Sequence, residues 1–291
     1  MKTSRPTRVW PAAPLLAASL LAASLPVVAV PQCADWSRRL PGVSRSLCEQ
    51  ARLLPSGAHS VHGVPLYRRD VGPRGEEATP WVGPAPREPR RVLVVGGIHG
   101  DELSSASLVF HWIAHAGMAP HGLDWRFVPA LNPDGLMLPK PTRVNANKVD
   151  LNRNFPTPRW AQEARVYWEK RTRRDPRRYP GRAAQSEPET RFLVDTITEW
   201  KPDLIVSVHA PYGVLDYDGP REPPQRLGRL ELERVGIFPG SLGHYGGVHK
   251  GVPVVTIELP NALRAPTETE MRQMWHDLLR WVDQRFQPGE R

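Results

Sequence analysis

Short apolar runs of strand length recur along the 291-residue chain and alternate with segments of helical periodicity. The runs that we expect to form strands cover residues 92–95, 125–130, 203–208 and 254–259. Nearly continuous apolar strands are typical of a sheet that is buried on both faces. Apolar residues at helical spacing follow the first run, over residues 103–113. This alternation predicts an α/β fold.

Two further helices are predicted from their first residues. Ser186 and Glu189 stand three residues apart before an apolar stretch, as in a capping box that opens a helix. Thr267 and Glu270 repeat the pattern ahead of the last apolar stripe of the chain. Both apolar stripes are expected to pack into the core.

The first 29 residues have the features of a secretory leader. Three basic residues come first, an apolar stretch covers residues 15–25, and Val27 and Ala29 occupy the positions that signal peptidase reads. The alternative, a membrane anchor, needs roughly 20 apolar residues, which this stretch does not supply. We expect residues 1–29 to be a signal peptide of a periplasmic or secreted bacterial protein, with no stable membrane anchor after cleavage.

Cys33 and Cys48 are the two cysteines of the chain, and both follow the predicted cleavage site. An exported protein meets an oxidising compartment, where an even pair of cysteines usually closes a disulfide. The alternative is a pair of free or redox-active thiols, but the spacing is not that of a C-x-x-C motif. We expect residues 30–59 to form an N-terminal extension with this disulfide, followed by a catalytic domain over residues 60–291.

The formal net charge is +9 over the whole chain, and it falls to +6 without the leader. Residues 165–182 contain eight Lys or Arg interleaved with aromatic residues, a composition that also occurs in nucleic-acid-binding segments. Charge runs of this kind more often form solvated surface. We therefore expect no nucleic-acid partner.

His99 and Glu102 follow the first apolar run and a Gly-Gly turn. Ligands bind at the carboxyl ends of strands in open α/β sheets, and residues three apart in a first helical turn point the same way. His209 ends another apolar run, so we expect it at the same edge of the sheet. Two histidines and a glutamate are a recurrent ligand set of catalytic zinc. The sequence thus predicts one Zn²⁺ per chain.

Glu258 interrupts an otherwise apolar strand. A charged side chain in such a strand is costly unless it has a function. A carboxylate near the metal, but not bound to it, can take a proton from the attacking water and pass it to the leaving amine. Glu258 is therefore the predicted general base, and the alternative is an ordinary glutamate of an edge strand that faces solvent.

Residues 150–156, D-L-N-R-N-F-P, predict a second kind of binding group. Asn152 and Arg153 offer an amide beside a planar fork of donors, which suits a free carboxylate. Upstream, Arg143 supplies a cation that can stabilise the oxyanion formed when water attacks an amide. The alternative for all three is a salt-bridged surface loop. The preferred interpretation predicts a small peptide substrate with a free carboxylate.

From about residue 60 to its end, the chain resembles the M14 zinc carboxypeptidase family. The strings that carry the resemblance are, in order, H-G-D-E, N-P-D-G, T-R-V-N, V-D-L-N-R-N-F-P, S-E-P-E-T, S-V-H and T-I-E-L-P. The resemblance implies a zinc peptidase with a mixed, mostly parallel sheet and helices on both faces. It implies these roles: zinc ligands His99, Glu102 and His209, general base Glu258, carbonyl-polarising Arg143, carboxylate clamp Asn152 and Arg153, and Asp150 as the residue that orients the first histidine.

Within the family, the compact spacing and the string N-P-D-G-L-M are most similar to the murein peptide amidase A branch. This likeness implies hydrolysis of the bond between γ-D-glutamate and meso-diaminopimelate in cell-wall peptides. The tyrosine that closes over substrate in the digestive members has no clear counterpart here. Tyr245 is the predicted replacement at the substrate pocket.

Two alternative functions share part of this pattern. The related aspartoacylase and succinylglutamate desuccinylase group has the zinc pair and a D-L-N-R string, yet it acts on N-acyl amino acids. A catalytically inactive relative would use the same cleft to bind peptides. Such relatives typically lose the base or a ligand, whereas this chain keeps all of them.

Overall fold

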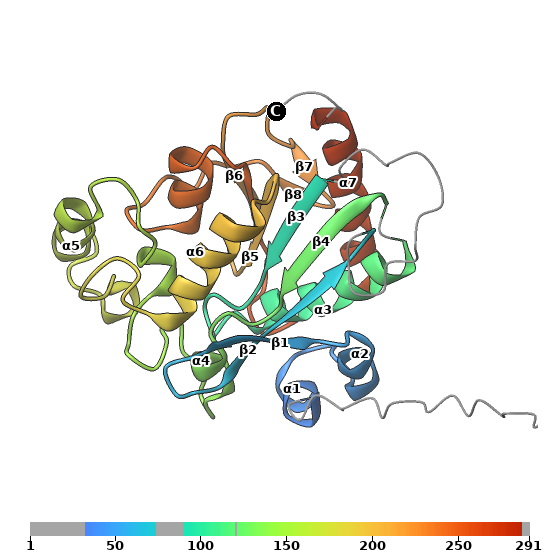
Figure 1. Cartoon of the computed structure of the whole chain (residues 1–291), viewed down its shortest axis with the longest axis horizontal. Coiled ribbons are helices and arrows are strands. Elements are labelled where there is room, and N and C mark those ends of the chain that lie inside the picture. Colours follow the sequence, from blue (N-terminus) through green and yellow to red (C-terminus); the bar gives the residue numbers. More distant parts are fainter. Residues whose placement is uncertain (1–32, 74–89, 120, 287–291) are drawn as a thin grey trace, which may run out of the picture.

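The computed structural model describes residues 33–73, 90–119 and 121–286 (Figure 1). The predicted signal peptide, residues 1–29, lies outside the described residues. Among the helices that are described, none combines the length and the apolar character needed to cross a membrane.

A seven-stranded sheet with the order β1-β2-β4-β3-β5-β9-β6 forms the centre of the molecule. Strands β4, β3, β5 and β9 are parallel, and β1, β2 and β6 pair antiparallel with their neighbours. The predicted mixed, mostly parallel sheet is thereby confirmed. The strand bounds are Leu54–His59 for β1, Pro65–Val71 for β2, Arg90–Val95 for β3, Leu123–Val128 for β4, Leu204–His209 for β5, Val214–Asp218 for β6 and Val254–Glu258 for β9, with a separate pair β7 (Arg226–Leu227) and β8 (Leu230–Glu231).

Helices cover both faces of this sheet (Figure 1). Helices α3 (Leu103–Met118) and α7 (Glu268–Arg285) pack on one face, and α6 (Pro188–Trp200) packs on the other. The remaining helical segments are α1 (Cys33–Arg39), α2 (Arg45–Gln50), α4 (Pro133–Met137), α5 (Trp160–Lys170), the 3₁₀ turns η1 (Leu151–Arg153) and η2 (Pro176–Arg178), and the π-helix η3 (His244–His249).

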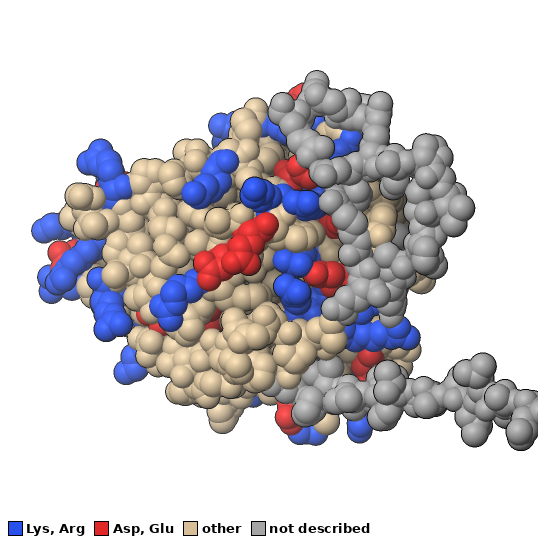
Figure 2. Space-filling model, in the orientation of Figure 1, with Lys and Arg blue, Asp and Glu red and all other residues tan. Residues whose placement is uncertain are grey.

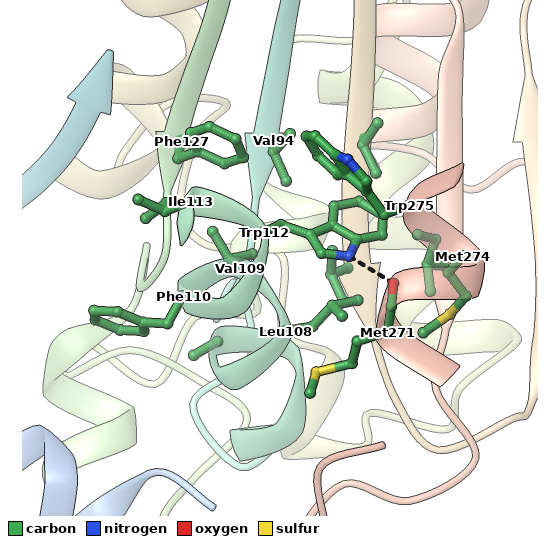
Figure 3. Close-up of a cluster of buried hydrophobic side chains, with 14 of the residues drawn as sticks. Val94, Leu108, Val109, Phe110, Trp112, Ile113, Phe127, Met271, Met274 and Trp275 are labelled. Carbon is green, nitrogen blue, oxygen red and sulfur yellow. Dashed lines mark hydrogen bonds between the residues drawn. The ribbon is translucent and has the colours of Figure 1, made fainter. Parts of the chain in front are cut away.

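Alternate residues of the central strands enter two different cores, because side chains of a strand point to opposite faces. Val94 of β3 packs with α3 and α7, whereas Val95 packs with α6. Figure 3 shows the first core, in which the indole N–H of Trp112 donates to the carbonyl of Met271 at 3.2 Å. The ring of Trp275 meets Trp112 edge-on at 5.4 Å, so α7 is fixed on α3 by both packing and hydrogen bonding.

Of the two predicted capping boxes, the one at α7 is confirmed. The Thr267 side chain accepts from the backbone of Glu270, and the Glu270 carboxylate accepts from the backbone of Thr267. The box predicted with Ser186 and Glu189 is wrong, because α6 begins one residue later with Glu187 at the N-cap and no side-chain cap bond. The Ser186 hydroxyl instead donates to the Glu187 carboxylate at 2.6 Å.

Amide donors from a neighbouring loop explain this difference at the start of α6. The side chain of Asn145 donates to Glu187 at 2.8 Å and to Glu189 at 3.1 Å, and Asn147 donates to Glu187 at 2.8 Å. Glu187 and Glu189 are both buried. These tertiary bonds replace the local cap and tie α6 to the loop that leads to residues 150–153.

The N-terminal segment is joined to the main core. The predicted disulfide between Cys33 and Cys48 is confirmed, and it links α1 to α2. Trp36 of α1 meets the rings of Tyr67 and Phe110 edge-on at 5.7 and 5.4 Å. Because β1 begins at Leu54, the last residues of the predicted extension form a strand of the central sheet rather than a separate unit.

The basic segment, residues 165–182, lies around α5 at one end of the molecule (Figure 1). Figure 2 shows Lys and Arg side chains gathered on the surface there. Part of its charge is balanced locally, since Arg165 and Arg174 both contact Glu169. Arg177 reaches the H-G-D-E loop and pairs with Asp101 at 2.9 Å. These contacts agree with a solvated surface.

Removing the disulfide is expected to destabilise the fold. The two cysteines are 15 residues apart, and closing a loop of this size contributes about 3 kcal/mol in the chain-entropy model. Cys33→Ala combined with Cys48→Ala should lower the free energy of urea unfolding by about that amount. Wild-type protein unfolded with and without a dithiol reductant is the matched comparison. Equal unfolding midpoints for the oxidised and reduced protein would contradict the prediction.

Candidate active site

The loop between β3 and α3 carries His99 and Glu102. Gly97 opens the loop with a φ of +59°, a conformation that glycine adopts without steric cost. Its carbonyl accepts from the backbone N–H of Asn132 at 2.8 Å, which ties the loop to the end of β4. Glu102 is the N-cap of α3, so the His99–Glu102 pair lies on the turn before the helix. The prediction that both residues lie in the first helical turn is wrong.

Two glycines bring three of the sequence strings together. A Cβ on Gly100 of H-G-D-E would lie 2.4 Å from the carbonyl carbon of Gly135 in N-P-D-G. A Cβ on Gly135 would lie 2.6 Å from the carbonyl oxygen of Val144 and 2.7 Å from that of Thr142. The loops therefore pack backbone against backbone, and this close contact places Arg143 beside the His99 loop.

His99, Glu102 and His209 converge on one point. The Nδ1 atoms of the two histidines are 3.1 Å apart, and the Glu102 carboxylate lies 2.8 Å from Nδ1 of His99 and 3.0 Å from Nδ1 of His209. The ligands of a tetrahedral zinc ion are separated by about 3.4 Å, given metal–ligand distances near 2.1 Å. The donor set and its spacing therefore fit a zinc ion.

The second ring nitrogen of each histidine, Nε2, contacts a polar side chain that orients the ring. Nε2 of His99 faces the Asp150 carboxylate at 3.1 Å, and Nε2 of His209 faces the hydroxyl of Ser207 at 3.0 Å. Partners of this kind fix ring orientation in metal sites. The sequence reasoning named Asp150 but missed Ser207, although its position two residues before His209 puts both side chains on one face of β5.

The buried carboxylates of the site each lie beside basic side chains. Burial would raise the pKa of Glu102, but the neighbouring His99 and His209 hold it well below its usual range. Burial would likewise raise the pKa of Asp150, and Arg143 with His99 holds it well below. Both carboxylates are therefore ionised and able to attract a cation at neutral pH.

Arg143 contacts both acids of the site. Its Nε donates to Asp150 at 3.0 Å, and its Nη1 lies 3.4 Å from the Glu102 carboxylate. The guanidinium has five N–H donors in total, so these two contacts leave others for a ligand. Arg143 thus provides a fixed positive charge beside the predicted metal ligands.

Glu258 lies directly opposite His209 in the pairing of β9 with β5. Its strand is interior, between β5 and β6, so the alternative of an edge-strand glutamate in solvent is wrong. The residue is 8% exposed, and its Oε2 has no hydrogen-bond partner among the described residues. Burial raises the pKa of this carboxyl, and the charge of Glu102 adds to the effect.

Arg153 is a buried cation beside the same site. It is 5% exposed, its guanidinium stacks over the Phe238 ring at 4.6 Å, and its Nε has no partner in the described part of the chain. The adjacent Asn152 side chain is oriented by the backbone N–H of Leu242, which donates to its Oδ1 at 2.8 Å. No carboxylate of the described residues forms an ion pair with Arg153, unlike Arg143.

Tyr245 does not join these residues. Its side chain is 2% exposed and belongs to the core under α6, where its ring stacks on Phe155 at 5.8 Å. A ring that is packed in this way has no free surface to cover a substrate. The prediction that Tyr245 binds substrate is therefore corrected: the π-helix η3 turns this side chain into the core.

Comparison with known proteins agrees with this geometry. The zinc carboxypeptidase family model matches residues 54–231. Murein peptide amidase A from Escherichia coli is 32% identical over 250 residues, which cover 82% of this chain and 96% of that protein. The protein of the same name from Vibrio campbellii is 34% identical over 177 residues, 58% of this chain and 69% of that protein.

Two solved structures show the same fold. The crystal structure of a murein-tripeptide amidase from Escherichia coli matches with a TM-score of 0.50 and 25% identity, over 80% of this chain and 92% of that chain. Carboxypeptidase A from Helicoverpa armigera matches with a TM-score of 0.61 and 18% identity, over 80% of this chain and 70% of that chain. The chain therefore belongs to the M14 zinc carboxypeptidase family of hydrolases.

Proposed function

We propose that the protein is an exported zinc-dependent amidase that cleaves γ-D-glutamyl-meso-diaminopimelate bonds in small murein peptides. The observation that carries the proposal is the convergence of His99, Glu102 and His209, with Glu258 directly opposite His209. The names of the similar proteins supply the substrate class, since they are called murein peptide amidases.

His99, Glu102 and His209 are the proposed holders of one zinc ion per chain. When bound, zinc supplies a Lewis acid that polarises the substrate carbonyl and lowers the pKa of water. Glu258 takes the proton from the attacking water and delivers it to the leaving amine, a role that its raised pKa and unpartnered oxygen support. Arg143 stabilises the negative charge that develops on the carbonyl oxygen.

Arg153 is the proposed partner of the free carboxylate of the substrate. A buried charge without a counter-ion is costly, so a ligand that brings a carboxylate gains a strong, charge-assisted hydrogen bond there. Asn152, whose amide is fixed by Leu242, adds a second polar group at the same place. This pair selects small peptides that end close to the scissile bond.

Export of the enzyme is supported by the disulfide between Cys33 and Cys48, because such bonds persist mainly in oxidising compartments. Together with the predicted signal peptide over residues 1–29, the disulfide supports a reaction in the periplasm or outside the cell. The substrates there would be stem peptides or fragments released from the wall.

Mass spectrometry of reaction products tests the proposed substrate. The enzyme should convert L-Ala-γ-D-Glu-meso-diaminopimelate to L-Ala-D-Glu and free diaminopimelate, and a chelator should abolish the reaction. N-acetylaspartate and succinylglutamate serve as the comparison for the alternative deacylase activity. Cleavage of these two compounds, with the tripeptide left intact, would overturn the proposal.

Replacing the proposed base should separate chemistry from metal binding. Glu258→Gln keeps the size of the side chain but cannot accept a proton, so kcat should fall by about 10²- to 10⁴-fold. Zinc content, measured by elemental analysis, should stay at one ion per chain. Glu199→Gln, on the exposed side of α6, is the matched control and should keep wild-type kcat. Undiminished turnover by the Glu258 variant would rule out its role as base.

Replacing Asp150 should weaken metal binding without removing a ligand. The Asp150→Asn variant loses the carboxylate that faces Nε2 of His99, and changes of this type reduce metal affinity by about 10- to 100-fold. Competition with a chromogenic chelator measures the affinity, and Asp195→Asn, on the exposed side of α6, is the control. An unchanged zinc affinity would contradict the orienting role of Asp150.

A further inference from the structure

The surplus positive charge of the protein is concentrated in residues 159–182, which include α5 and η2. This segment contains nine Lys or Arg and three Asp or Glu, so its net charge is +6. The chain without its predicted leader also has a net charge of +6, so the other residues after position 29 sum to zero. We call the exposed side of residues 159–182 the α5 surface, and Figure 2 shows Lys and Arg side chains gathered there.

Acidic neighbours neutralise part of the α5 surface. Five of its cations pair with an acid of the described structure: Arg159 with Glu163, Arg165 and Arg174 with Glu169, Arg177 with Asp101, and Arg178 with Asp175. The other four form no ion pair within the described ranges, and all four are exposed: Lys170, Arg171, Arg173 and Arg182. Like charges gathered on one surface repel one another, so an anionic partner that binds there relieves an unfavourable interaction.

The α5 surface is hollowed as well as charged. An open hollow of about 410 Å³ lies beside α5, and its charged lining residues are three cations and one acid: Arg159, Lys170, Arg171 and Glu163. A concave surface with cations on several sides can surround an oxyanion. Charge-assisted hydrogen bonds of this kind are stronger than those between neutral groups.

Direct contacts connect the α5 surface to the candidate active site. Arg177 pairs at 2.9 Å with Asp101, the residue before the predicted metal ligand Glu102. On α5, the ring of Tyr167 meets Phe238 edge-on at 5.8 Å, and Phe238 is the ring on which Arg153 stacks. A chain bound along the α5 surface therefore lies beside both the metal-ligand loop and the proposed carboxylate clamp.

The composition of the α5 surface indicates the kind of partner. Eight of its nine cations are arginines, whose planar guanidinium matches carboxylate oxygens with two parallel hydrogen bonds. An anionic membrane is a less suitable partner, because helices that lie on membranes insert an apolar face. On α5, Val166 is the one large apolar side chain that is exposed.

Resting on the proposed function, we propose that the α5 surface binds the cell-wall polymer itself through the carboxylates of its stem peptides. A γ-linked D-glutamate keeps its α-carboxylate free, and diaminopimelate has a carboxylate at each end, so a stem bears more negative than positive groups. Because the polymer carries many stems, several carboxylates reach the surface together and their weak contacts add up. Binding of this kind holds the enzyme at the source of its substrate.

Sedimentation with purified murein sacculi tests the proposal. The protein should pellet with sacculi at low salt and be released in about 1 M salt, where the Debye length falls to about 3 Å. Sacculi whose carboxylates have been converted to amides should not retain it. Vesicles of phosphatidylglycerol test the alternative partner. Absence of binding to sacculi, or binding to the vesicles and not to sacculi, would overturn the proposal.

A variant that removes the four unpaired cations locates the binding surface: Lys170→Gln, Arg171→Gln, Arg173→Gln and Arg182→Gln. Its affinity for sacculi should fall by at least about tenfold, as expected for the loss of four exposed ion pairs. The matched control removes four exposed cations elsewhere and should bind like the wild type: Lys201→Gln, Arg226→Gln, Arg264→Gln and Arg272→Gln. Equal losses in the two variants, or no loss in the first, would reject the α5 surface as the binding site.

Turnover of the soluble tripeptide keeps the two proposals apart. None of the four substituted residues belongs to the proposed catalytic machinery, so kcat/KM for L-Ala-γ-D-Glu-meso-diaminopimelate should stay at the wild-type value. Circular dichroism checks the fold, and the double variant Arg171→Gln with Arg173→Gln replaces the quadruple variant if that one does not fold. If no tripeptide is cleaved, the proposed function fails, yet binding to sacculi that the α5 variant loses would still support the surface.

Discussion

The register between β5 and β9 determines the chemistry of this molecule, because it sets Glu258 beside His209. The backbone N–H of Leu259 donates to the carbonyl of His209 at 2.8 Å and extends this pairing past the strand ends. A slip of one residue would turn Glu258 into the core under α3 and α7, where Ile257 now packs. The apolar residues that fill this core therefore also fix the carboxylate beside the proposed metal ligands.

The buried charged side chains of the site differ in whether all their polar atoms have hydrogen-bond partners. Side chains with every atom bonded hold the structure together, and those with an unbonded atom are suited to bind a ligand. Asp150 contacts His99 and Arg143 and is fully enclosed, so it holds other residues in place. Arg153 and Glu258 each keep an unpartnered polar atom in the described structure. Such atoms are expensive to bury, and a ligand that satisfies them recovers that cost.

The sequence allowed the fold and the convergence of the strand-end residues to be predicted, because parallel strands bring their carboxyl ends to one edge of the sheet. Ser207 was missed, since its position matters only once His209 and the face of β5 that carries it are known. Tyr245 and Ser186 were misjudged for a related reason. Local motifs suggested their roles, but packing of Tyr245 on Phe155 and the bond of Ser186 to Glu187 override them.

Family membership and geometry support different parts of the site. The family match ends at residue 231, so it includes the three proposed zinc ligands but not Glu258. The position of Glu258 beside His209 is supported by the pairing of β9 with β5. Anomalous X-ray diffraction at the zinc absorption edge, from crystals grown with zinc, tests the central claim most directly. One peak about 2.1 Å from Nδ1 of both His99 and His209 is predicted. A zinc peak elsewhere, with none between these rings, would contradict it.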